Sequence, residues 1–126
     1  MNQGNGVFWR MDYQYRRKLS DIKDGLSNTF MVGEDLPEKN AWCSWPYASH
    51  TYGTCAIPPN YNKNPDGTDI HPMDWYNTHS FRSSQVGGLQ FGMADGSVRF
   101  ISSDIELTLY RALDTLNGRE RVVVPD

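Results

Sequence analysis

The segment 89–101 limits the folds open to this chain more than any other part of its sequence. Two runs of alternating apolar and polar residues flank Asp95-Gly96, a dipeptide preferred in two-residue type I′ turns. A turn of that type places four apolar side chains on one face of a hairpin, with Phe91 opposite Phe100 and Met93 opposite Val98. The sequence therefore predicts an antiparallel hairpin over 89–101 with that face buried.

A helix is predicted directly after the hairpin, over about residues 104–117. Ser103 and Glu106 have the spacing of a capping box, and Gly118 follows as a C-terminal cap. Apolar residues recur along one side of this helix: Ile105, Leu109, Ala112, Leu113 and Leu116. Such a stripe needs an apolar surface to cover, and we expect that surface to be the sheet.

Upstream of the hairpin, the clearest strand is predicted at residues 29–34, after a tight turn at Asp24-Gly25. Weaker strands are predicted over 7–15 and 121–125. A chain of 126 residues is long enough for one modest core. We therefore predict a single α+β domain spanning residues 1–126, with a twisted antiparallel sheet and the C-terminal helix packed on it.

Residues 36–79 form a long insertion without strand or helix periodicity. The segment holds six of the seven prolines of the chain, which interrupt regular structure. It is also rich in large aromatic side chains, which disordered segments lack: Trp42, Trp45, Tyr47, Tyr52, Tyr61, Trp75 and Tyr76. We predict an ordered loop outside the sheet, and long loops of this kind commonly carry function.

The overall composition excludes several classes of function. The net charge is −3, so no basic field exists to hold a polyphosphate backbone, and nucleic acid is excluded as a partner. The cationic run Arg16-Arg17-Lys18 is next to Asp21 and Asp24 and is interpreted as a solvated turn. No stretch approaches the roughly 20 apolar residues of a membrane-spanning helix. The sequence predicts a soluble chain without membrane insertion.

Two cysteines, Cys43 and Cys55, lie within the aromatic insertion. Their short separation suits a disulfide loop formed in an oxidising compartment. The alternative interpretation is a pair of buried free thiols. We predict the disulfide.

Two motifs, at residues 24–34 and 87–100, resemble a large family abundant in planctomycetes. The family is known as domain of unknown function 1559 and carries a prepilin-type processing-associated His-x9-Asp-Gly signature. Its members look like type IV pilins or pseudopilins, with a cleavable leader, a hydrophobic N-terminal helix and a globular domain containing an antiparallel sheet. The resemblance implies a cell-envelope or extracellular protein that assembles with pilin-like copies, and it implies no reaction.

The sequence departs from the family pattern in two respects. Gln85 stands where the signature has its histidine, so the position keeps hydrogen-bonding capacity but loses a titratable imidazole. The first residues also lack the apolar core of an export signal and the apolar helix of a pilin. Made as written, the chain is expected to stay in the cytoplasm and outside an ordinary pilus filament.

Carboxylates supply the main catalytic alternative. Two of them facing each other at about 5–9 Å would serve the hydrolysis of glycosidic bonds. The candidates are Glu34 and Asp35, which follow the first strand, and Asp95 in the hairpin turn. The competing interpretation of Asp95 is that of a turn former.

Aromatic side chains supply the main binding hypothesis, because flat rings stack on the apolar faces of sugars and other small solutes. We expect such a ligand at seven residues of the insertion and its vicinity: Trp42, Trp45, Tyr47, Tyr52, Trp75, Tyr76 and Gln85.

Other chemistry finds weaker support, and no metal or cofactor is predicted. The side chains of zinc-binding type lack any zinc-binding spacing: Cys43, His50, Cys55, His71 and His79. Residues 64–69 offer oxygen ligands for calcium, but we interpret them as an Asx-rich turn. None of Ser44, Ser80 and Ser97 lies in the Gly-x-Ser-x-Gly turn of many hydrolases. The sequence thus favours a non-enzymatic, pilin-like domain for assembly or ligand recognition, with a small glycosidase as the alternative.

Overall fold

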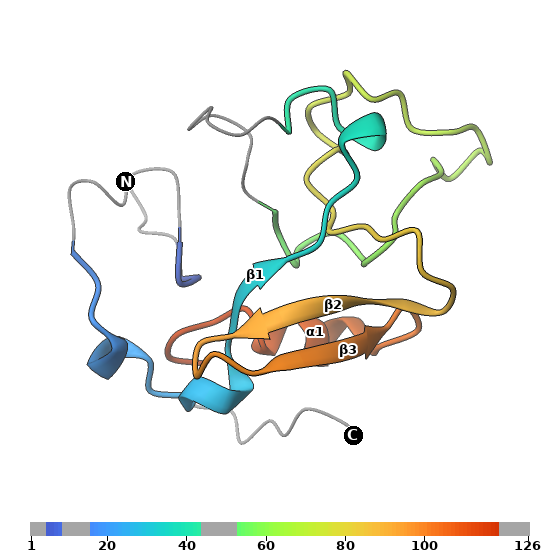
Figure 1. Ribbon diagram of the computed structural model, residues 1–126. Helices are drawn as coiled ribbons and strands as arrows, with labels where there is room; N and C mark the ends of the chain where they lie inside the picture. The colour runs from blue at the N-terminus through green and yellow to red at the C-terminus, as the bar shows by residue number, and fades with distance from the viewer. Residues whose placement is uncertain (1–4, 9–15, 44–52, 119–126) are drawn as a thin grey trace.

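The fold is an antiparallel three-stranded sheet covered on one face by a short helix, in a computed structural model that describes residues 5–8, 16–43 and 53–118 (Figure 1). The strands are ordered β1-β2-β3 in the sheet. Their bounds, with those of the helix, are Phe30–Gly33 for β1, Gly88–Met93 for β2, Val98–Ser102 for β3 and Leu107–Ala112 for α1. The predicted α+β class, the strand at 29–34 and the hairpin are confirmed.

The register of the hairpin differs from the prediction by one residue. Phe91 pairs with Arg99 and Gln90 with Phe100. The turn is a three-residue loop, in which the Gly96 amide donates to the Met93 carbonyl at 3.0 Å and the Met93 amide donates to the Ser97 carbonyl at 2.8 Å. A type I′ turn needs positive φ at both central residues, whereas only Gly96, at φ 86°, adopts it here.

This register separates the apolar residues that the sequence pattern had placed together. Phe91 and Met93 are buried under α1, but Val98 and Phe100 lie on the opposite face of the sheet and are exposed. The prediction of one buried face shared by all four is therefore wrong. The reason is the period of two along a strand, which sends every side chain of β3 to the other face when the register slips by one residue.

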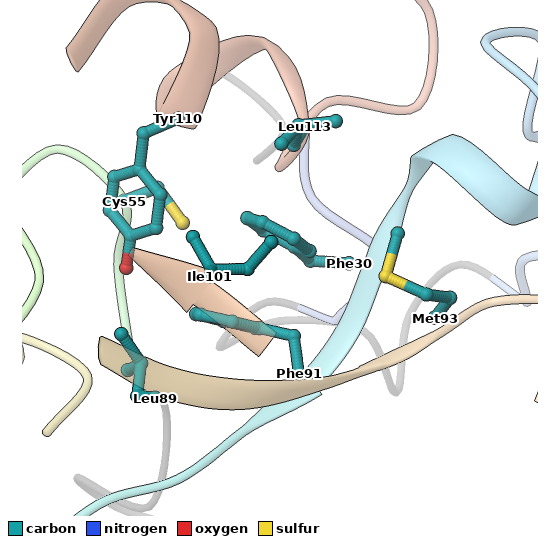
Figure 2. Packing of buried hydrophobic residues seen from close by; sticks show 8 residues of the cluster. All are labelled: Phe30, Cys55, Leu89, Phe91, Met93, Ile101, Tyr110 and Leu113. Atoms are coloured by element: carbon teal, nitrogen blue, oxygen red, sulfur yellow. The ribbon is translucent and has the colours of Figure 1, made fainter. Parts of the chain in front are cut away.

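The core lies between the sheet and α1 (Figure 2). Side chains from β1, β2 and β3 point toward the helix, and Tyr110 and Leu113 meet them from its side. The ring of Phe30 stacks on that of Phe91, with centroids 4.0 Å apart. The predicted helix stripe did not include Tyr110, which is fully buried at its centre.

The helix is shorter than predicted and is capped differently. Glu106 itself is the N-cap residue, because its two carboxylate oxygens accept from the amides of Thr108 and Leu109 at 2.9 and 2.8 Å. At the other end, the Leu113 carbonyl accepts from the Phe30 amide at 2.8 Å, and the Leu116 carbonyl accepts from the Lys23 amide at 2.7 Å. These pairings to other segments take the place of further helical turns, so the predicted capping roles of Ser103 and Gly118 are wrong.

The described part of the insertion, 36–43 and 53–79, packs as irregular loops beyond the end of β1 (Figure 1). Its one helical turn is the 3-10 segment Pro37–Lys39. Residues 64–69 form the expected Asx-rich turn, in which Asp66 Oδ1 accepts from the amide and the hydroxyl of Thr68 at 2.9 and 2.6 Å. We call residues 36–43 and 53–82 the loop layer.

The remaining sequence predictions concern the two weaker strands, the turn at Asp24-Gly25 and membrane insertion. Residues 9–15 of the predicted opening strand and the predicted strand 121–125 lie outside the described residues, and residues 7–8 are not in a strand. The turn at Asp24-Gly25 is confirmed, with Gly25 at φ 95°. Within the described part of the chain, no helix has the length and apolar character needed to span a membrane.

Candidate functional site

The three candidate carboxylates are each engaged by neighbouring backbone or side-chain groups. Glu34 Oε2 accepts from the backbone amide of Gln90 at 2.7 Å, and the Glu34 backbone amide donates to the Gln90 carbonyl at 3.3 Å, so the pairing of β1 with β2 extends by one residue. Asp95 Oδ1 accepts from the amide and the hydroxyl of Ser97 at 2.8 and 2.6 Å, and these bonds lower the pKa of Asp95. Both groups therefore stabilise the sheet locally.

The fold does not place Glu34 and Asp95 opposite each other. Glu34 lies beside Gln90, whereas Asp95 lies in the turn beyond Met93, where β2 ends. Three residues of extended strand already separate Gln90 from Met93 by roughly 10 Å. No described contact joins these two carboxylates across a pocket.

Asp35 contributes to a buried polar centre that the sequence analysis missed. Its Oδ1 lies 3.7 Å from Arg82 Nη1, and its Oδ2 accepts from the side-chain amide of buried Asn40 at 3.0 Å. The side chain of Arg82 is only 1% exposed. A buried guanidinium is rare unless its donors are satisfied, so the surroundings of Arg82 decide how the loop layer is held.

The Arg82 guanidinium donates to four backbone carbonyls of the loop layer. Nη1 donates to Thr78 and Ser80 at 2.7 and 3.1 Å, and Nη2 donates to Asn77 and Tyr61 at 2.8 and 3.1 Å. Burial lowers the pKa of Arg82, and the charge of Asp35 opposes that shift. Arg82 is therefore a structural clamp for the loop layer. A single arginine has no sequence pattern that would identify it as such a clamp.

The aromatic candidates are placed unevenly. Trp75 and Tyr76 are exposed and stack on each other, with ring centroids 3.8 Å apart. Trp42 is also exposed, whereas Trp45, Tyr47 and Tyr52 lie outside the described residues. Gln85 is exposed, and its backbone amide donates to Ser83 Oγ at 3.1 Å. The structure thus presents the outer faces of a stacked ring pair, which we call the Trp75-Tyr76 platform, on loops that Arg82 holds.

The outer face of the sheet, opposite α1, is an exposed apolar surface. Its three large side chains are Val32, Val98 and Phe100, which are 54%, 65% and 51% exposed. Val32 lies over Gly92, and the ring of Phe100 lies over Gly88. Neither glycine has a side chain, so the apolar groups rest directly on the backbone of β2. α1 lies behind β2 and β3 in Figure 1, which leaves the outer face toward the viewer. We call Val32, Val98 and Phe100 the outer-face patch.

The predicted disulfide is absent, because Cys43 and Cys55 are both free thiols. Cys55 is part of the hydrophobic core, where burial raises its pKa. Cys43 lies beside Asp35; partial burial raises the pKa of Cys43, and the carboxylate adds to that shift. Cys55 is thus used as a small apolar core residue, in a different environment from that of Cys43.

A cavity of about 240 Å³ lies beside β1, between aromatic side chains that include Phe8, Phe30 and Phe81. Asp114 also lines it, and burial raises the pKa of this carboxyl to about 6. The hydroxyl of nearby Tyr110 is also buried, close to Cys55 and Asp114. This cavity therefore contains an acid that changes charge near neutral pH.

The raised pKa of Asp114 predicts that stability falls as pH rises from 5 to 7. Asp114 binds its proton more tightly in the folded state, so its protonated form stabilises the folded protein. This contribution is fully present below the unfolded pKa of about 3.8 and is lost as pH rises through about 6. At about 1.4 kcal/mol per pKa unit, the loss over the whole titration is at most about 3 kcal/mol, and roughly half of it falls between pH 5 and 7. Urea unfolding at several pH values measures it.

Asp114→Asn should flatten this pH dependence of stability. Asp104→Asn is the control, because it removes an exposed carboxylate and should leave the pH dependence unchanged. The lowered pKa values of Asp66, Asp95 and Glu106 act in the opposite direction, because ionisation of these groups stabilises the fold. Their effect belongs to pH values below about 4.5 and so lies outside the measured window. An equal slope in the wild type and in Asp114→Asn would contradict the assignment.

No group of three or more His, Cys, Asp or Glu side chains in the described residues is arranged to hold a metal ion.

The family model described as "Protein of unknown function (DUF1559)" matches residues 1–108. This chain belongs to the DUF1559 family. The match covers both motifs from which the resemblance was drawn. A search of curated proteins and a search of solved structures each found no match.

Proposed function

We propose that this DUF1559 chain is a non-catalytic, pilin-like domain that docks a protein neighbour of a cell-envelope assembly on the outer face of its sheet. The observation that carries the proposal is the outer-face patch. Three large apolar side chains exposed together on one rigid sheet face are unfavourable in water and are typical of interaction surfaces. The three side chains that define the patch are all apolar, as expected for a surface used in assembly.

The neighbour we propose is a second copy of the chain, because pilin-like domains repeat within an assembly. Self-association buries the patch of one copy against an apolar surface of the next. The net charge of −3 is small, so repulsion between copies is weak at physiological salt.

Phe100→Asp tests this proposal, because it places a charge within the patch without touching the core. Sedimentation measured from micromolar to millimolar concentration should show reversible association of the wild type and its loss in Phe100→Asp. Tyr76→Asp is the matched control, since it adds the same charge at an exposed ring on the loop layer. Association that is absent in the wild type, or equally weakened by both variants, would refute self-assembly through this face.

A second candidate function is carbohydrate recognition by the Trp75-Tyr76 platform. The exposed stacked rings favour it, because a sugar ring packs its apolar face on such a surface. Binding of a glycan panel should be lost in Trp75→Ala and kept in Phe100→Ala. Retention of binding in Trp75→Ala would refute the platform.

The glycosidase alternative has no geometric support, since the three carboxylates bond to their own surroundings. We expect that any glycosidase activity measured with the purified protein stays unchanged in three variants: Glu34→Gln, Asp35→Asn and Asp95→Asn. A chromogenic-glycoside panel measures this, and a loss of turnover in one variant that remains folded would revive the alternative.

A further inference from the structure

A groove near the start of the described chain has an apolar floor and a cationic rim. It encloses about 450 Å³, within the range of about 300–1,000 Å³ typical of small-molecule sites. Six apolar residues line it: Val7, Phe8, Leu19, Ile22, Met31 and Leu116. The remaining lining residues are Arg16, Arg17 and Lys18.

The walls of this groove come from segments that backbone hydrogen bonds hold together. The Leu116 amide donates to the Asn5 carbonyl at 2.9 Å, and the Lys23 amide donates to the Leu116 carbonyl at 2.7 Å. Phe8 and Leu19 are 63% and 61% exposed. The side chains of Phe8 and Leu19 therefore face water inside the groove. Their exposure is a property of the fold, because backbone hydrogen bonds hold the neighbouring segments in place.

Among the described residues that line the groove, the charged ones are all cationic, although the chain as a whole is acidic. Arg16 and Lys18 are exposed and line it, and residues 16–22 contain one carboxylate, Asp21. Asp21 Oδ2 accepts from the Lys18 amide at 2.8 Å. The next carboxylate, Asp24, is also bonded to backbone, accepting from the Gly118 amide at 2.7 Å. The rim thus favours an anion, while the floor favours a hydrocarbon.

We propose that this groove binds a single-chain amphiphile with an anionic head group, such as a fatty-acid carboxylate. The hydrocarbon chain lies on Phe8, Ile22 and Met31, where it removes apolar surface from water. The head group lies at the rim near Arg16 and Lys18, where a carboxylate accepts charge-assisted hydrogen bonds. This site is separate from the outer-face patch, and the proposal does not depend on self-assembly.

Calorimetry with dodecanoate below its micellar concentration tests the proposal on the full chain. Dodecyltrimethylammonium, which has the same chain length and the opposite charge, should bind at least about tenfold more weakly. The double variant Arg16→Glu/Lys18→Glu should weaken dodecanoate binding by roughly tenfold or more, because two attractions become repulsions. Lys39→Glu/Lys63→Glu changes the same charge elsewhere and should bind as the wild type does.

Amide chemical shifts give a readout that does not depend on affinity changes. Dodecanoate should shift the amides of Leu19, Ile22 and Met31 in the wild type and leave that of Val98 on the outer face. Absence of binding, equal binding of the cationic amphiphile, or shifts confined to the outer face would each overturn the proposal. So would binding to phosphatidylglycerol vesicles without binding to dodecanoate, because that result indicates docking on a lipid surface.

Discussion

Arg82→Met is expected to lower the free energy of unfolding by about 3–5 kcal/mol, the range measured when one partner of a buried ion pair is removed. Methionine fills a similar volume but supplies none of the donors of the guanidinium. Four carbonyls of the loop layer then lose their partner, and Asp35 loses its cation. Urea unfolding followed by tryptophan fluorescence measures the loss, since Trp42 and Trp75 belong to the same layer.

Lys39→Met is the matched control, because it removes an exposed cation from the same layer. It should change stability by less than about 0.5 kcal/mol, as for most surface substitutions. Asp35→Asn should cost less than Arg82→Met, because the carbonyl partners of Arg82 remain in place. A cost below about 1 kcal/mol for Arg82→Met would show that the loop layer does not depend on its clamp.

Phe91→Ala is expected to destabilise the protein by about 3–5 kcal/mol, as for other large-to-small substitutions in a core. The ring stacks on Phe30 and meets the edges of Phe81 and Tyr110, so its removal leaves a cavity with several unpacked aromatic groups. Thermal unfolding by circular dichroism and urea titration should both report the loss.

Phe100→Ala is the decisive comparison for Phe91→Ala, because both residues lie on the hairpin. The observed register places Phe100 on the outer face, so its truncation should cost less than about 1 kcal/mol. The register of a two-residue turn would bury both rings on one face. Similar large costs for the two variants would therefore contradict the three-residue loop.

Local sequence patterns were sufficient for the order and the type of the main elements. Alternation predicted the hairpin, and the apolar stripe predicted a helix after it. The turn at Asp24-Gly25 indicated the strand that follows at 29–34. The two motifs around these strands indicated the family, and the family model that matches residues 1–108 confirmed it. These features depend on residues close together in the chain, where turn chemistry and periodicity act directly.

Boundaries and pairings depended on contacts that local patterns do not contain. The helix stops at Ala112 because the carbonyls of Leu113 and Leu116 accept from Phe30 and Lys23, far away in sequence. Cys55 remains a thiol within the core, where it packs among residues of the sheet and helix. Spacing alone had favoured a disulfide with Cys43.

The surfaces proposed for binding show where sequence reasoning reaches its limit. The sequence by itself determined that the chain has a β-hairpin at Asp95-Gly96, a helix after it and a polar, aromatic-rich insertion. Only the tertiary structure decided that Phe100 faces outward, that Arg82 clamps the loop layer, and that Phe8, Ile22 and Leu116 line one groove. The physical reason is that a one-residue slip in register reverses a strand's faces, and that grooves and buried charges are assembled from segments distant in the chain.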